Sequence, residues 1–182
     1  MEALHDWHEF YFMLGSSAAA LVALLFVAIS VGIGFFDRGN VTATRTFISS
    51  IVVHFSCVLF VAAMALVPGH APNLVAIVLL AAGVVGAIVA LISSVNIFRE
   101  PEPIGLEIID YFAYGIVPLI AYCKIIVAAL TLRAHWEWGP ELLATGVLLL
   151  LLINIRNAWD TVLTVVRRQT AREKAKRGKR KR

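Results

Sequence analysis

Five long apolar runs dominate this chain and restrict it to one class of fold. A helix needs about 20 apolar residues to cross the hydrocarbon of a bilayer. Five segments of the sequence reach that length: 10–35, 47–67, 73–98, 109–132 and 142–166. Hydrophobic residues make up 60% of the chain, whereas about 45–50% is usual in soluble domains. The sequence therefore predicts an all-α polytopic membrane protein, a bundle of five transmembrane helices.

Charge is distributed unevenly along the chain. Residues 167–182 contain ten Lys or Arg and one Glu, a charge of +9, which leaves −5 for the rest. A terminal block of like charge repels itself and stays in water. We therefore expect a transmembrane domain over 1–166 and a disordered basic tail over 167–182. We expect this tail to bind the anionic headgroups of the bilayer. Binding to RNA or another acidic partner is the alternative, and we favour a nucleic acid less than the lipid headgroups.

The positions of Lys and Arg also predict the direction of the chain. These residues concentrate in loops on the cytoplasmic side of a membrane. The opening MEALHDWHEF has neither residue, nor does the connector after the second span, whereas the tail is strongly basic. Five crossings then place the amino end outside and the carboxyl end in the cytoplasm, although Arg133 falls on the outer side.

Small residues recur at helical spacing in two of the spans. Ala82, Gly86 and Ala90 are four residues apart with Gly83 beside them, and Gly15 begins a run of small residues in the first span. Helices in lipid associate through smooth faces of this kind, because small side chains let two backbones approach closely. The pattern predicts helix packing within the bundle. A subunit interface or a pore lining is the alternative.

Five polar residues within the apolar spans are candidates for a functional role. Arg156 and Asp160 are four residues apart in the last span, so they share a helix face, and Asn157 is beside them. His54 and Lys124 are near the middle of the second and fourth spans. A charge at this depth is costly unless it is paired or faces the bundle interior.

We interpret the pattern in the last span as an internal polar clamp. The alternatives are an ion or proton path and a surface that docks a partner. Three of the polar groups, His54, Lys124 and Arg156, are cationic or can become so. Among transport functions, this balance favours an anion or water-filled path over a path for metal cations, and a proton relay through His54 also fits.

Four histidines fall on the predicted outer face: His5, His8, His70 and His135. His5 and His8 are three residues apart, a spacing that one helical turn can bring to a metal ion. Scattered surface histidines are the reading that we prefer to a zinc or copper site, so no cofactor is predicted.

Two stretches resemble segments of small bacterial inner-membrane proteins of unassigned function. One is WHEFYFMLGSSAAALVALLFVAISV near the start, and the other is INIRNAWDTV in the last span. Some of those proteins are loosely labelled as modulators of a membrane protease. The resemblance implies a multi-pass protein of the bacterial cytoplasmic membrane and a regulatory or assembly role, and it assigns no role to any residue.

Motifs of catalysis are absent from the sequence, which contains no Gly-rich phosphate loop, no H-E-x-x-H and no G-x-S-x-G. We therefore expect no enzymatic activity. A bundle of this size has little interior room, so a functional cavity would form more easily between copies in a homo-oligomer. The expected function is a homo-oligomeric channel or transport protein. The alternative is a non-catalytic accessory, scaffold or regulatory subunit that docks to another membrane complex.

Overall fold

The computed structural model describes the backbone of residues 7–32, 41–67, 72–99 and 112–180, and every regular element in these ranges is a helix. The elements are α2 (His8–Gly32), α3 (Val41–Leu66), α4 (Pro72–Arg99), the π-helix η2 (Phe112–Ile116), α6 (Val117–Arg133) and α7 (Gly139–Arg180). They supply five stretches that are long and apolar enough to cross a membrane, with η2 and α6 forming one of them. The prediction of an all-α chain with five helices able to span a membrane is confirmed over the described residues.

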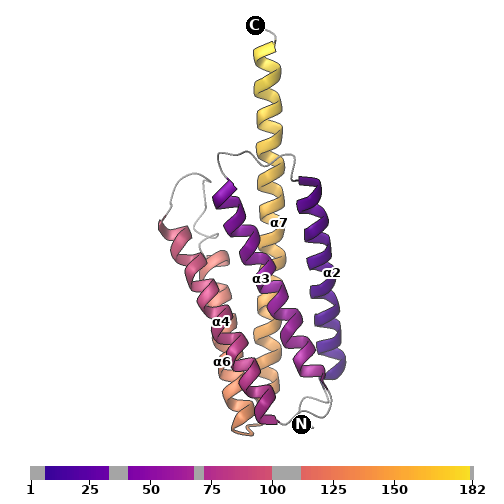
Figure 1. Ribbon diagram of the computed structural model, residues 1–182, viewed down its shortest axis with the longest axis vertical. Helices are drawn as coiled ribbons and strands as arrows, with labels where there is room; N and C mark the ends of the chain where they lie inside the picture. The colour runs from indigo at the N-terminus through magenta and orange to yellow at the C-terminus, as the bar shows by residue number, and fades with distance from the viewer. Residues whose placement is uncertain (1–6, 33–40, 68–71, 100–111, 181–182) are drawn as a thin grey trace.

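Successive helices run in opposite directions and pack side by side (Figure 1). Each of α3, α4, α6 and α7 contacts the helix before it, and α7 also returns to contact α3 and α2. Short connections favour such antiparallel neighbours; the turn between α6 and α7 spans only 134–138. Helices satisfy their own backbone hydrogen bonds, which is the requirement that lipid imposes on a spanning segment.

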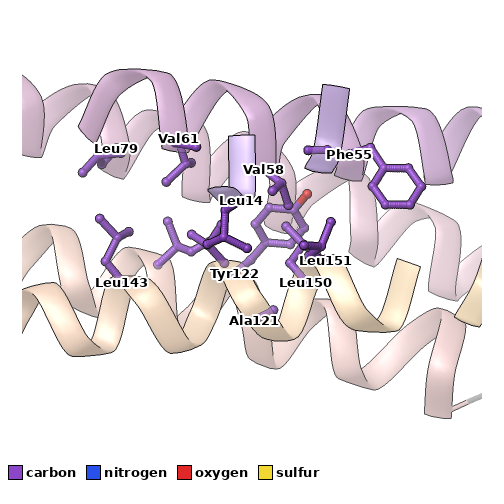
Figure 2. Packing of buried hydrophobic residues seen from close by; sticks show 14 of the residues in the cluster. Leu14, Phe55, Val58, Val61, Leu79, Ala121, Tyr122, Leu143, Leu150 and Leu151 are labelled. Atoms are coloured by element: carbon purple, nitrogen blue, oxygen red, sulfur yellow. The ribbon is translucent and has the colours of Figure 1, made fainter. Parts of the chain in front are cut away.

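Apolar side chains from four helices fill the centre of the bundle. Leu14 of α2, Val61 of α3, Leu79 of α4 and Leu143 of α7 are fully buried, and Figure 2 shows them together with their neighbours in the core. The outward faces are equally apolar, with side chains such as Leu152 more than half exposed. An apolar surface on both sides of a helix is typical of a bundle that faces lipid.

The last helix continues far beyond the bundle. Figure 1 shows α7 extending past the ends of the other helices, and its backbone is helical through Arg180. Most of the segment 167–182, which we expected to be disordered, is therefore helical. The physical reason is local: Ala, Arg, Lys, Glu and Gln are good helix formers, and a helix that is already nucleated adds residues at little cost.

Candidate functional site

Buried polar side chains gather in one half of the bundle. We call it the tail-side half, because α7 leaves the bundle there; α3 begins and α4 ends in the same half. The opposite half contains the turn 134–138 and is called the turn-side half. Among the side chains that the structure describes, the buried polar ones are Ser50, His54, Ser93, Ser94, Thr131, Asn154 and Asn157. All of these except Thr131 belong to the tail-side half.

His54 connects two helices at the inner edge of this polar half. Its Nε2 atom is 3.0 Å from the Ser50 hydroxyl, one turn earlier in α3, and its Nδ1 atom is 2.7 Å from the Tyr122 hydroxyl of α6. The side chain is only 2% exposed. Both ring nitrogens are therefore bonded to hydroxyl groups inside the bundle, which is what a buried imidazole requires.

The small-residue face of α4 makes room for this tyrosine. A Cβ atom added at Gly86 would overlap the Tyr122 ring, and one added at Gly83 would lie 2.8 Å from Ile126 Cγ1. Both glycines are buried where α4 packs against α6. Gly86 thus lets Tyr122 cross in front of α4 and reach His54.

Two of the other small residues, Gly15 and Ala90, also pack within the chain. Ala90 is buried in α4, and Ala82 is half-buried in the same helix. In α2, a Cβ atom added at Gly15 would lie 3.2 Å from the Cβ of Ala62, so α2 and α3 pack closely at this point. Gly15 therefore brings α2 and α3 together, and Ala90 belongs to the apolar core of the same bundle.

Asn157 repairs a backbone defect caused by a proline. In a π-helix, the N–H of residue i+5 donates to the carbonyl of residue i. In this pattern, the backbone N–H of residue 118 would donate to the Ala113 carbonyl oxygen, but Pro118 has no N–H. Asn157 Nδ2 donates to the Ala113 carbonyl oxygen instead, at 3.0 Å. Because Ala113 and Asn157 are both buried, this amide satisfies a carbonyl that water would not reach.

Tyr114 joins the polar residues of the last span. Its hydroxyl donates to the Asn157 backbone oxygen at 2.8 Å, and it lies 3.3 Å from Asp160 Oδ2 and 3.2 Å from Thr161 Oγ1. An Arg156 guanidinium nitrogen donates to Asn157 Oδ1 at 3.4 Å. The predicted residues Arg156, Asn157 and Asp160 therefore form one network. Its hub is Tyr114, to which the sequence pattern alone did not point.

Lys124 lies apart from both networks. It is half-buried on the outer surface between α6 and α7, where its Nζ atom donates to the Thr145 hydroxyl at 3.1 Å. The two helices are close here: a Cβ atom added at Gly146 would lie only 3.0 Å from the Cβ of Lys124. The three groups that we predicted near the middle of the spans, His54, Lys124 and Arg156, therefore do not form one cluster. His54 is in the interior, whereas Lys124 faces outward.

Asn154 is a further interior polar residue that the sequence pattern did not identify. It is fully buried, and its Nδ2 atom donates to the Leu150 carbonyl oxygen at 2.7 Å. Its Oδ1 atom has no hydrogen-bond partner among the described residues. The available signal was its spacing, since Asn154 precedes Asn157 by three residues and shares a helix face with it.

The histidines do not form a metal site in the described part of the chain. His8 and His135 are exposed, while His5 and His70 lie outside the described residues. Over those residues, no group of three or more His, Cys, Asp or Glu side chains is close enough to hold a metal ion. That the chain needs no cofactor stays a prediction, and zinc or copper binding at this face stays its less favoured alternative.

We expect Arg156 and Asp160 to be energetically coupled through their shared network. Arg156→Gln and Asp160→Asn should each lower the thermal stability in detergent, and the double variant should lose less than the sum of the two. Coupling of polar residues in membranes averages about 0.6 kcal/mol and seldom exceeds about 1.7 kcal/mol. The same cycle in a Tyr114→Phe background should show weaker coupling. Additive losses in the native background would contradict the clamp.

No family model, curated protein or solved structure matches this chain. The resemblance to small bacterial inner-membrane proteins therefore stays a prediction. The geometry of the bundle has to carry the argument about function.

Proposed function

We propose that the protein is a non-catalytic accessory subunit that docks to another integral membrane protein. The observation that carries this proposal is the interior of the described part of the bundle, which has no continuous line of polar side chains. In the tail-side half, most buried polar side chains are hydrogen-bonded to another side chain or to a backbone carbonyl oxygen, and most buried side chains of the turn-side half are apolar. Such an interior suits a structural partner better than a conduit for ions.

The polar interior stops at the pair formed by His54 and Tyr122. Beyond it, most interior side chains are apolar, among them Val58, Val61, Leu79 and Leu143. Two buried hydroxyl groups of the described residues in this half, those of Tyr11 and Thr131, each donate to a backbone carbonyl oxygen. A hydrated ion needs polar groups or water along the whole of its path. The described interior therefore offers no continuous line of such groups along the bundle.

A path between copies of the chain would be lined by the outward faces instead. On α6 and α7, these faces present large apolar side chains, with Ile120, Val127 and Leu152 each about half exposed. Lys124 and Thr145 are a polar interruption in this surface. An apolar face suits contact with lipid or with another helix better than contact with a column of water. Homo-oligomerisation, which we expected from the sequence, does not by itself supply a polar path.

Transport of protons or single water molecules is the second candidate function. Two observations favour it: Asn154 Oδ1 is buried without a partner among the described residues, and His54 links two hydroxyl groups. An imidazole can take a proton at one nitrogen and release it from the other. The channel or transport function that the sequence suggested is therefore kept as the alternative, restricted to these small species.

We further propose that the protein lies in the bacterial cytoplasmic membrane, with the amino end outside and the basic tail in the cytoplasm. The distribution of Lys and Arg supports this direction. Trp138 and Trp159 are both exposed, and the helical rise puts about 30 Å between them along α7. This span matches the hydrocarbon thickness of about 30 Å, and tryptophan concentrates at the two interfaces.

A flux measurement on the purified full chain tests the proposed function. After reconstitution into lipid vesicles, we expect proton, potassium and chloride fluxes to equal those of protein-free vesicles, because the described interior has no continuous line of polar side chains. Vesicles treated with gramicidin serve as the positive control for proton and potassium flux, and vesicles treated with a chloride ionophore serve as the control for chloride flux. Proton flux that disappears in a His54→Gln variant would instead establish the second candidate. Chloride or potassium flux above background would overturn the accessory role.

A further inference from the structure

Lys124 places a cation in hydrocarbon at the surface of the bundle. Its Nζ atom is level with Thr145, which comes seven residues after Trp138. A rise of about 1.5 Å per residue puts this level about 10 Å below Trp138. Because exposed tryptophans mark the membrane interface, the ammonium group is inside the apolar layer and not among the headgroups.

The described part of the chain neutralises this cation incompletely. An ammonium group has three donors, and the described residues give it one acceptor, the neutral hydroxyl of Thr145. Glu141 is one turn closer to the interface and forms no ion pair with Lys124. A charged side chain in hydrocarbon is costly until it is paired, so this position favours an outside partner with a negative charge.

A second copy of the chain is poorly suited to supply that charge. In the described part of the chain, the carboxylates of the spans and of the turn lie near the ends of the spans: Glu9, Glu137, Glu141 and Asp160. A copy inserted in the same direction would therefore bring no described carboxylate to the level of Thr145. The basic tail keeps all copies in that one direction.

We propose that Lys124 and Thr145 form the docking point for a transmembrane helix of another protein that carries a Glu or Asp at the same depth. The proposal rests on the accessory role argued above and names the chemistry of the partner. The surrounding face fits a helix, because Ile120 and Val127 flank Lys124 on α6 with exposed apolar side chains. Carboxylate and ammonium would then neutralise each other in a layer where neither finds water.

A synthetic transmembrane helix tests this inference without knowledge of the natural partner. The probe is a Leu–Ala peptide with a donor fluorophore and a single Glu about 10 Å from one interface; the matched peptide has Gln there. Energy transfer to the full-length protein, labelled at its carboxyl end in phosphatidylcholine vesicles at pH 8, reports association. We expect the Glu peptide to bind about three- to fifteenfold more tightly than the Gln peptide, as polar helix contacts in membranes allow.

Variants of the protein then locate the preference. The preference for the Glu peptide should disappear in Lys124→Met and persist in Lys124→Arg. The arginine variant keeps the positive charge, so it tests the proposal even if the methionine variant fails to fold. Arg133→Met removes a cation near the interface and should leave the preference unchanged. Equal binding of the two peptides to the native protein would overturn the proposal and indicate that Lys124 contacts lipid headgroups. A preference for the Glu peptide that survives Lys124→Met would also overturn the proposal. Flux above background would overturn the accessory role alone, so the two failures are distinguishable.

Discussion

Replacing Gly86 with alanine should lower the free energy of unfolding by about 2–4 kcal/mol, although the change adds one methyl group. That methyl group would overlap the Tyr122 ring, which is fully buried between α4 and α6. Overpacking of this kind costs about 1–3 kcal/mol. Moving the ring also breaks its 2.7 Å hydrogen bond to His54, which contributes about 1 kcal/mol. Thermal unfolding in detergent, followed by the loss of folded protein on size exclusion, measures the effect.

Two comparisons separate this cause from a general intolerance of alanine. Gly83→Ala adds the same group beside Ile126 Cγ1, an aliphatic side chain without a hydrogen bond to lose, so the loss should be smaller. Combining Gly86→Ala with Tyr122→Ala removes the overlap, and the pair should be no less stable than Tyr122→Ala alone. A Gly86→Ala protein that melts with the native one would contradict the contact between Gly86 and Tyr122.

The five spans could be predicted because bilayer thickness alone sets their length and composition. Contacts within one helix could also be predicted from the sequence. Helical geometry places Arg156 and Asp160 on one face, and they belong to one network in the structure. The hub of that network, Tyr114, is on a different span. Its contacts depend on how two helices are placed against each other, which no local pattern encodes.

The direction in which a side chain faces was equally inaccessible from the sequence. Counting along the fourth span predicts the depth of Lys124 but not that it points outward. In a soluble protein, the apolar stripe of a helix reveals its buried face. Here the helices are apolar all round, with exposed residues as large as Leu152 and buried ones as large as Leu150. The stripe is therefore lost, and only the packed structure separates lipid-facing residues from interior ones.

Asn157→Leu should lower the free energy of unfolding by about 1–3 kcal/mol. Leucine has a similar volume, but it cannot donate to the Ala113 carbonyl, which Asn157 Nδ2 serves at 3.0 Å. A buried acceptor without a partner loses about this much free energy, and because Ala113 and Asn157 are both buried, no water replaces the lost donor. The change also removes the Oδ1 acceptor of Arg156. The same detergent unfolding measurement applies.

The role of Pro118 gives this prediction an unusual control. If Asn157 replaces the N–H that proline lacks, Pro118→Ala restores a backbone donor in the same stretch of chain. Asn157→Leu should then cost less in the Pro118→Ala background than in the native one. Tyr114→Phe, which removes a hydroxyl and leaves the Ala113 carbonyl bonded to Asn157, should show no such rescue by Pro118→Ala. Equal losses from Asn157→Leu in both backgrounds would mean that Asn157 stabilises the bundle through Arg156 or through packing, and not through the π-helix.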